Sequence, residues 1–507
     1  MVWRRIAKKK MTPLSEIIFG TSANKEAKRL RRLLQAGKAR KIAPRLYTTN
    51  MSDPPAKVVQ DNLYEILGGL FPKAVLSHRT ALEGKPTAQW EVFLTTSYSR
   101  TVRLPGLTVR LLKGPPAGAE DKPFMGALFI ASQPRAFLEN IQRTRSGSAA
   151  SKTIPRKELE ERLERLLRLR GEKALNALRD DARRVAKELS LLKEFKALDW
   201  IIGAMLKTKP ASGLRSSLAK ARAAGAAFDP ERLRLFETLF SALRKTPLHE
   251  TPEPLVRSQA LRTLAFFEAY FSNYIEGTRF EVDEARAIIF EGKIPSARPK
   301  DAHDVLGTYR VVSNLSELRK LPQDAERLWT LLSTRHEAIL DARPETQPGE
   351  IKAEINRAGE TVFVAPDLVR GTLAKGFEFY KVLDSPSARA AFMMFLISEV
   401  HPFNDGNGRI ARVMMNAEFV AAGLRRIIIP TVFRDDYLGA LRAHSRRGDP
   451  TAYLRMIDRA ARFSASIDFS DFASARRALE AANAFKDPGE ARLRDVVAGR
   501  KRESAED

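Results

Sequence analysis

Apolar residues recur at helical spacing over most of the chain. Residues 156–170 carry leucines at every third or fourth position among charged residues, which predicts an amphipathic helix with one buried face. Residues 230–243 and 261–270 repeat this pattern, and residues 473–482 continue it near the C-terminal end. Residues 390–397 are apolar without interruption, as in a helix that is buried on all sides. The hydrophobic pattern therefore predicts a mainly α fold.

The N-terminal part of the chain has shorter elements. Residues 25–35 predict a short basic helix, and residues 40–50 alternate toward a strand. Residues 93–109 and 124–131 predict further short strands with turn residues between them. A helix, a basic turn and a basic strand in this order are typical of a winged helix-turn-helix. We therefore expect a small α+β domain ahead of the helical part.

The composition narrows the class of protein. A chain of 507 residues with 44% hydrophobic residues can form two or three domains with sizeable cores. It contains no cysteine, which excludes disulfides, thiolate metal sites and a cysteine nucleophile, and which agrees with the cytoplasm. The longest apolar runs are about eight residues, too short to span a membrane. The basic N-terminus lacks the apolar segment of a signal peptide, so we expect a cytoplasmic protein with no membrane segment.

Positive charge is concentrated near the N-terminal end. The net charge is +26, and residues 1–50 hold fourteen Lys and Arg against two Glu. Such a cluster favours a polyanion, most simply DNA or RNA, or the acidic face of a protein. A solubilising segment without a partner is the alternative, and the sequence leaves both interpretations open.

Prolines and small residues mark the limits between segments. Residues 207–225 are rich in small residues, and three prolines follow between positions 247 and 254. We expect four parts, which are an α+β domain in residues 1–155, a helical linker region in 156–250, a helical domain in 251–470, and a C-terminal helix with a disordered tail in 471–507.

The densest chemistry lies in residues 401–412, His-Pro-Phe-Asn-Asp-Gly-Asn-Gly-Arg-Ile-Ala-Arg. They stand between the apolar run at 390–397 and a second apolar helical pattern. Glycines let backbone N–H groups point at an anion, and a helix N-terminus favours negative charge. Arg409 and Arg412 leave the same helix face and can hold a polyphosphate, while His401 is placed for proton transfer. The segment predicts a helix-loop-helix that binds nucleotide phosphates.

These residues resemble the signature of the Fic family, His-x-Phe-x-Asp/Glu-Gly-Asn-Gly-Arg-x-x-Arg, at every fixed position. Fic proteins typically transfer AMP from ATP to a hydroxyl side chain of a target protein, so the resemblance implies an all-helical domain with this activity. It implies that His401 is the general base for a Ser, Thr or Tyr hydroxyl and that Asp405 holds Mg²⁺ at the α- and β-phosphates. The other implied contacts are with phosphate: an anion hole from Gly406, Asn407 and Gly408, with Asn407 at the α-phosphate, Arg409 at the β-phosphate and Arg412 at the γ-phosphate.

A second resemblance lies in residues 272–277, Ser-Asn-Tyr-Ile-Glu-Gly. They resemble the inhibitory motif Ser/Thr-x-x-x-Glu-Gly/Asn of many Fic proteins, in the class whose inhibitory helix precedes the core motif. Ser272 and Glu276 are four residues apart and share a helix face, and Gly277 suits the end of that helix. The resemblance implies that Glu276 pairs with Arg412, blocks the γ-phosphate site and holds ATP in a non-productive pose. An ordinary surface glutamate at a helix end is the alternative.

Residues 349–366 resemble the β-hairpin flap of Fic proteins, which pairs with the target peptide as an added strand. A plain surface hairpin is the alternative. Residues 284–292 match the place of a family helix that ends in glycine. Lys352 stands near the point where the family usually has arginine, so no role is inferred for it. The sequence does not identify the adenine pocket; Tyr437 is a candidate, although a packing aromatic is the simpler interpretation.

Residues 20–160 resemble, less specifically, the AbiEi-type antitoxin and transcriptional-regulator domain. The resemblance rests on Arg-Lys-Ile…Leu-Tyr-Thr within residues 40–48 and on Leu-Ser-His-Arg-Thr-Ala-Leu at residues 76–82. It implies a winged-helix-like domain that binds DNA. His78, in the second stretch, is expected to have a structural role.

Two classes of function follow. The first is an autoinhibited protein adenylyltransferase with ATP as co-substrate, Mg²⁺ as metal and a target protein as partner. The second is a nucleic-acid-binding regulator, in which the N-terminal domain binds DNA or RNA and the Fic domain only senses nucleotide. A variant of the first class transfers another phosphate-linked group. Fic proteins often form dimers, so the resemblance also leaves a homodimer open.

Overall fold

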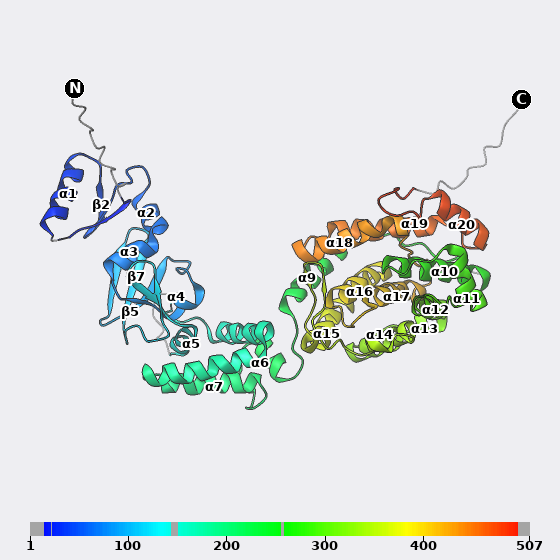
Figure 1. The fold of residues 1–507 in the computed structure, drawn as a ribbon, viewed down its shortest axis with the longest axis horizontal. Coiled ribbons are helices and arrows are strands. Elements are labelled where there is room, and N and C mark those ends of the chain that lie inside the picture. The colour runs from blue at the N-terminus through cyan, green and yellow to red at the C-terminus, as the bar shows by residue number, and fades with distance from the viewer. Residues whose placement is uncertain (1–14, 22, 143–150, 255–257, 495–507) are drawn as a thin grey trace, which may run out of the picture. The chain divides into compact units, whose positions relative to one another are not determined.

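The computed structural model describes residues 15–21, 23–142, 151–254 and 258–494. The chain divides into two compact units, residues 1–224 and 225–507 (Figure 1). The mainly α class is confirmed, with an α+β region toward the N-terminus. The division between the units falls inside the stretch 156–250 that we expected to be a linker, and the four-part division stays a prediction. The first fourteen residues of the basic segment and the expected C-terminal tail lie outside the described residues.

A three-stranded antiparallel sheet begins the first unit. Its strands lie in the order β1-β3-β2 and are β1 (Ile17–Phe19), β2 (Arg40–Ala43) and β3 (Leu46–Thr48). Helix α1 (Asn24–Gln35) connects β1 to β2. The stretch expected as one strand at residues 40–50 turns at Arg45, whose φ is 60°. Residues 23–50 therefore form one helix and a hairpin, and the winged-helix interpretation stays a prediction.

A mixed six-stranded sheet follows in the first unit, in the order β6-β7-β5-β4-β9-β8. Its strands are β4 (Val75–Leu76), β5 (Glu91–Thr96), β6 (Arg100–Leu104), β7 (Leu107–Lys113), β8 (Lys122–Phe124) and β9 (Leu128–Ile130). β5 pairs with β7 in parallel, with Glu91 opposite Thr108, and β4 pairs with β9 in parallel. β7 is buried at alternate residues, Leu107, Val109 and Leu111, as expected for a strand with one face on a core, whereas β5 is buried from Glu91 to Thr95.

The helices of the first unit include a group with its own core. The unit contains α2 (Pro55–Asp61), α3 (Leu63–Leu70), α4 (His78–Glu83), α5 (Gln133–Ile141), α6 (Arg156–Glu188), α7 (Leu192–Met205) and α8 (Ser217–Ala223). Gly171, with φ 74°, interrupts α6, so the helix expected at residues 156–170 is its first half. Leu159 and Leu163 of that half pack with apolar residues of α5, α7 and α8. The expected linker thus contributes a packed helical layer to this unit.

His78 starts α4 and is buried. Its backbone N–H donates to Glu139 at 2.9 Å, and its ring nitrogens lie 3.1 Å from Ser77 Oγ and 3.2 Å from Gln142 Oε1. Burial lowers the pKa of His78. These contacts tie α4 to α5, which agrees with the structural role expected for this histidine.

The second unit is built almost entirely from helices. They are α9 (Pro230–Leu243), α10 (Ser258–Ile275), α11 (Val282–Glu291), α12 (Pro299–Ser313), α13 (Leu315–Leu318), α14 (Ala325–Leu340), α15 (Val369–Tyr380), α16 (Pro386–Val400), α17 (Asn407–Ala421), α18 (Arg434–Arg447), α19 (Thr451–Ser466) and α20 (Phe472–Ala481). Its strands, β10 (Arg357–Ala358) and β11 (Thr361–Val362), pair as a hairpin. Short 3-10 turns lie at Pro344–Thr346, Pro366–Leu368 and Thr431–Phe433.

Helices α16 and α17 lie in the middle of this unit, with α18 and α14 on opposite sides of them (Figure 1). All residues from Ala390 to Ile397 are buried, as the uninterrupted apolar run predicts. Ile410, Val413 and Met414 of α17 are also buried. This packing fixes the end of α16 and the start of α17, where the signature residues stand.

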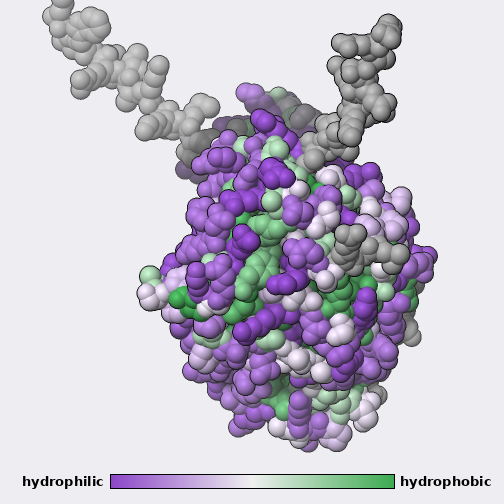
Figure 2. All heavy atoms as spheres, turned by 90° about the vertical axis from the view of Figure 1, so that its right-hand side faces the viewer, coloured by the Kyte–Doolittle hydropathy of each residue, from purple (hydrophilic) through white to green (hydrophobic). Residues whose placement is uncertain are grey.

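The face of the molecule in Figure 2 is mostly hydrophilic, and its hydrophobic side chains form separate strips. Scattered apolar exposure of this kind is usual for a folded surface. No helix among the described residues is long and apolar enough to cross a membrane.

Candidate active site

His401 ends α16 in a left-handed conformation, with φ 53°. Its Nδ1 lies 3.2 Å from the carbonyl oxygen of Ser398. Because a carbonyl only accepts, Nδ1 carries the proton and the lone pair is on Nε2. Phe363, just after β11, stacks on the imidazole with ring centroids 3.7 Å apart. Burial, assisted by the charge of Lys352, lowers the pKa of His401 to about 4, so the ring is a neutral proton acceptor at neutral pH.

The start of α17 offers backbone N–H groups to an anion. Gly406 has φ 72° and caps the helix, so the N–H groups of the following residues point out of its first turn. The side chain of Asn407 is buried and bonds the backbone of Phe403 in both directions, at 2.9 and 2.8 Å. The side-chain amide of Asn407 is therefore occupied by Phe403, and it is the backbone N–H of Asn407 that can bind an incoming phosphate.

Glu276 lies against this helix start. A Cβ atom added at Gly408 would overlap the Glu276 carboxylate. Arg412 Nη2 donates to Glu276 Oε1 at 2.8 Å and to the carbonyl of Ser272 at 2.8 Å, and Arg412 Nε donates to Ser272 Oγ at 3.0 Å. The structure thus brings the two residues of the second motif onto Arg412, as the sequence predicted.

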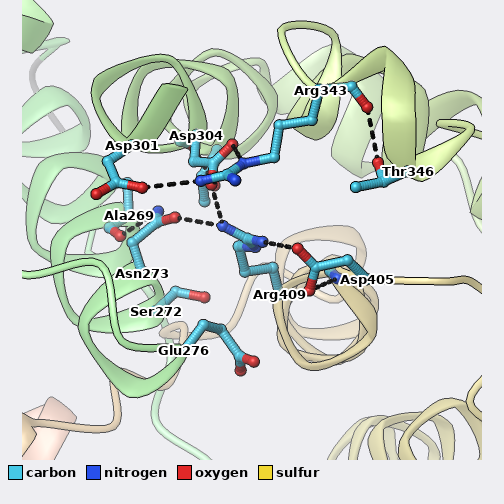
Figure 3. A network of polar contacts seen from close by, with 12 residues as sticks. Ala269, Ser272, Asn273, Glu276, Asp301, Asp304, Arg343, Thr346, Asp405 and Arg409 are labelled. Carbon is cyan, nitrogen blue, oxygen red and sulfur yellow. Dashed lines mark hydrogen bonds and ion pairs between the residues drawn. The ribbon is translucent and has the colours of Figure 1, made fainter. Parts of the chain in front are cut away.

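Arg409 belongs to a separate network with Asp304, Asn273 and Asp405 (Figure 3). Its Nη1 donates to Asp304 at 2.8 Å and to Asn273 at 3.2 Å, and its Nη2 lies 3.4 Å from Asp405 Oδ2. The guanidinium of Arg409 is buried. The expected contact of Arg409 with a β-phosphate therefore has two carboxylates competing with it in this structure.

A cavity of about 210 Å³ opens beside these groups. Its wall includes His401, Gly408, Glu276 and Arg412 at one end, and it continues along α18. The lining residues from α18 are Tyr437, Leu438, Leu441, Arg442 and Ser445. The hydroxyl of Tyr437 lies 3.3 Å from Arg412 Nη1, so this residue contributes to the site as well as to packing. The apolar part of the wall suits a nucleobase, beside the phosphate-binding loop.

Comparisons with known proteins agree with this geometry. The family model Fic/DOC family matches residues 328–418. A Fido domain-containing protein of Dictyostelium discoideum is 31% identical over 108 residues, which cover 76% of that protein and 20% of this chain. The chain belongs to the Fic/DOC family. Protein adenylyltransferase fic-1 of Caenorhabditis briggsae is 26% identical over 212 residues.

The matches to curated Fic adenylyltransferases are partial. The C. briggsae alignment covers 40% of this chain and 42% of that protein, so the chain spans less than half the length of this relative. Among solved structures, Fic-1 (residues 134–508) from Caenorhabditis elegans is similar at 20% identity, with a TM-score of 0.35, over 67% of this chain and 97% of that chain.

Asp405 of the Fic motif fits a divalent cation only together with a nucleotide. Its side chain is about half exposed, and its Oδ1 accepts from the N–H of Gly406 at 2.7 Å. Among the described residues, no group of three or more His, Cys, Asp or Glu could hold a metal ion. One carboxylate completed by phosphate oxygens and water is a ligand set that Mg²⁺ takes in nucleotide enzymes.

His336 of α14 supports the Fic loop and was not identified from the sequence. Its Nε2 donates to the carbonyl of Asp405 at 2.8 Å, and its Nδ1 accepts from the N–H of Gly349 at 2.9 Å. Its ring stacks on the buried Phe403, with centroids 3.8 Å apart, so Phe403 anchors the loop by packing. Burial lowers the pKa of His336 to about 4. A single histidine on a helix carries no sequence signal for this role.

The segment ahead of the β10–β11 hairpin contacts the loop through Lys352 and Asn356. Lys352 Nζ donates to Asn356 Oδ1 at 2.7 Å, and Asn356 Nδ2 donates to the carbonyl of Phe403 at 3.0 Å. Lys352 is buried, and burial, more than the nearby charge of Arg232, lowers its pKa to about 7. Lys352, for which no role was inferred from the sequence, thus helps to hold residues 352–356 against the loop.

Proposed function

We propose that this Fic protein is an adenylyltransferase that transfers AMP from ATP to a Ser, Thr or Tyr hydroxyl of a target protein. One observation supports this most directly: a neutral imidazole and an anion-binding helix start face the same cavity. Phosphate-transfer chemistry needs positioning and charge stabilisation more than covalent work by the protein. The similarity to named adenylyltransferases, although it covers only part of each chain, agrees with the proposal.

The residues have complementary parts in the reaction. The hydroxyl oxygen of the target attacks the α-phosphorus, and the bond from the α-phosphorus to the oxygen of the β-phosphate breaks. Nε2 of His401 takes the hydroxyl proton, and pyrophosphate leaves. The N–H groups at the start of α17 stabilise negative charge on the phosphates, and Arg412 binds the terminal phosphate once Glu276 is displaced.

Mg²⁺, when bound with ATP, neutralises the phosphate oxygens and orients the leaving group. Asp405 would hold it, because this carboxylate is accessible and stands directly ahead of the helix start. The flap β10–β11 would bind the target as an added strand, since its Thr361 lines the same cavity.

The contact of Glu276 with Arg412 supports autoinhibition. A carboxylate that lies on Gly408 and bonds the buried Arg412 occupies the position that a γ-phosphate needs. Two anions cannot share this site without strong repulsion. ATP would therefore bind with its phosphates displaced from the attacking hydroxyl until α10 moves.

The transferred group is tested by labelling. Glu276→Gly protein incubated with ATP labelled at the α-phosphate should gain label, and the same protein incubated with ATP labelled at the γ-phosphate should gain none. Label from the γ-phosphate alone would show that the terminal phosphoryl group, and not AMP, is transferred. ATP binding without incorporation from any nucleotide would favour the nucleotide-sensing regulator.

The pH profile follows from the pKa of His401. The base acts in its neutral form, and a pKa lowered to about 4 keeps it neutral above that pH. The rate of transfer should therefore be flat from about pH 5.5 to 7.5 and fall only as the pH approaches about 4. Initial rates across this range, at saturating ATP, measure the profile; an acid limb centred near pH 6.5 would contradict it.

A second function, nucleic-acid binding by the first unit, is favoured by the basic face of α1. Lys28, Arg29 and Arg32 lie on one side of this helix and are exposed. Replacing all three by glutamine should weaken DNA or RNA binding and reduce the slope of log K against log salt by up to about three. The matched control replaces Arg165 and Arg170, two exposed arginines of α6, and should leave the slope unchanged. Equal effects of the two variants would argue against a site on α1.

A further inference from the structure

Arg409 is held by a carboxylate outside the signature motif. Asp304, on α12, is buried and accepts from Arg409 Nη1 at 2.8 Å. The same carboxylate accepts from Arg343 Nε with both oxygens at 2.9 Å. Figure 3 shows Asp304 and Arg343 on one side of the Arg409 guanidinium and Asp405 on the other. One buried carboxylate therefore lies between two guanidinium groups.

The ion pairs of Arg409 with Asp304 and with Asp405 differ in strength. Asp304 and Arg409 are both almost fully buried, where an ion pair is little screened by water. Asp405 is 49% exposed and lies at the longer distance of 3.4 Å. Asn273 is neutral and its contact is 3.2 Å, so it cannot replace the charge of Asp304. Asp304 is accordingly the main partner of Arg409.

The arrangement bears on the proposed metal ligand. Asp405 and Arg409 are four residues apart around the start of α17, so they can form a direct ion pair. A divalent cation bound by Asp405 would have to displace that guanidinium. The contact with Asp304 holds Arg409 Nη1 at 2.8 Å, while Nη2 approaches Asp405 Oδ2 only to 3.4 Å and the Asp405 side chain stays 49% exposed.

We propose that Asp304, held by Arg343, is a positioning residue that keeps Arg409 from neutralising Asp405 and so sets the affinity of the site for the divalent cation of the nucleotide. The proposal rests on the proposed function, because it assigns Asp405 to the cation. Asp304 itself touches neither nucleotide nor metal. Residues that contact a metal ligand directly commonly change metal affinity by about 10- to 100-fold when they are removed, and Asp304 acts through one such residue, Arg409.

The test measures ATP binding by calorimetry, with Mg²⁺ and again with EDTA, in the full chain carrying Glu276→Gly. The gain in affinity that Mg²⁺ gives is the ratio of the two dissociation constants. In Asp304→Asn this gain should fall by about tenfold or more, because Arg409 turns to Asp405. Asp304→Glu, which keeps the charge, should restore part of it.

The matched control is Asp301→Asn. Asp301 accepts from Arg343 Nη2 at 2.8 Å but does not contact Arg409, so the gain from Mg²⁺ should be unchanged. Since Asp304→Asn removes a carboxylate shared by the buried Arg409 and the partly buried Arg343, a charge-balanced variant, Asp304→Asn with Arg343→Met, provides a second measurement if the first does not fold. This double variant should show the same reduction in the gain of ATP affinity that Mg²⁺ gives.

The outcomes separate the two proposals. Equal loss of affinity with Mg²⁺ and with EDTA, or the same loss of gain in Asp301→Asn, would show a structural role and overturn the inference. A Glu276→Gly protein whose ATP affinity does not depend on Mg²⁺ would also overturn it while leaving nucleotide binding intact. A protein that binds no ATP in either condition would refute the proposed function, and the inference with it.

Discussion

Replacing Glu276 by glycine should raise the rate of AMP transfer on the order of a hundredfold. The carboxylate of Glu276 bonds the buried guanidinium of Arg412 at 2.8 Å and lies on Gly408. A charge-assisted contact of this kind stabilises the closed site by about 2–3 kcal/mol. Roughly one molecule in a hundred is then open at rest, and removal of the carboxylate opens nearly all of them. Incorporation of α-labelled AMP into the protein or into lysate targets measures the change.

Charge and bulk can be separated at this position. Glu276→Gln keeps the side chain over Gly408 but removes the negative charge, so its activation should lie between those of the parent and the glycine variant. Glu291→Gly, at the exposed end of α11, is the matched control and should leave the rate unchanged. A glycine variant no more active than the parent, although folded and able to bind ATP, would contradict the inhibitory role of Glu276.

The helices around the site follow from the sequence because their pattern is local. The apolar run at residues 390–397 predicts a fully buried helix, and α16 is one. The spacing of Ser272 and Glu276 predicts that both face one partner, and both bond Arg412. Such features depend on the spacing of residues within one or two helical turns, and this spacing is visible in the sequence.

The orientation of Arg409 does not follow from the sequence. Arg409 and Arg412 are three apart, so their spacing predicts that both face the same phosphate. In the structure they have different partners, because Asp304 of α12, more than a hundred residues earlier, accepts from Arg409, while Ser272 and Glu276 accept from Arg412. His336 is a similar case, since its two bonds join the loop and the flap through the backbone. Partners brought together by tertiary packing leave no local pattern.

The N-terminal hairpin is a related case, and the winged-helix interpretation stays a prediction. The stretch at residues 40–50 alternates like one strand, but a left-handed residue at Arg45 turns it into a hairpin. Only the packing of β3 between β1 and β2 fixes that turn. The basic face of α1 is nevertheless exposed, so the interpretation as a nucleic-acid-binding surface is still testable.

Replacing His401 by alanine in the Glu276→Gly protein should lower the rate of AMP transfer by about 10²–10⁴-fold. Its Nε2 is the only ring nitrogen free to take a proton, because Nδ1 donates to the carbonyl of Ser398. ATP affinity should change little, since the phosphates bind to the start of α17 and to Arg412. Single-turnover labelling together with calorimetric ATP binding distinguishes a loss of chemistry from a loss of binding.

The matched control for this variant is His303→Ala, which removes an exposed histidine on α12 far from the loop in sequence. It should transfer AMP at the rate of the Glu276→Gly parent.

Phe363→Leu is a further measure of the same assignment, because Phe363 stacks on the imidazole at 3.7 Å and orients it without donating or accepting a proton. Its rate should fall less than that of His401→Ala, and its pH profile should shift toward the ordinary pKa of histidine as water reaches the ring. If His401→Ala retained the parent rate, the proton would have to leave by another route, and the assignment of His401 as the base would be wrong.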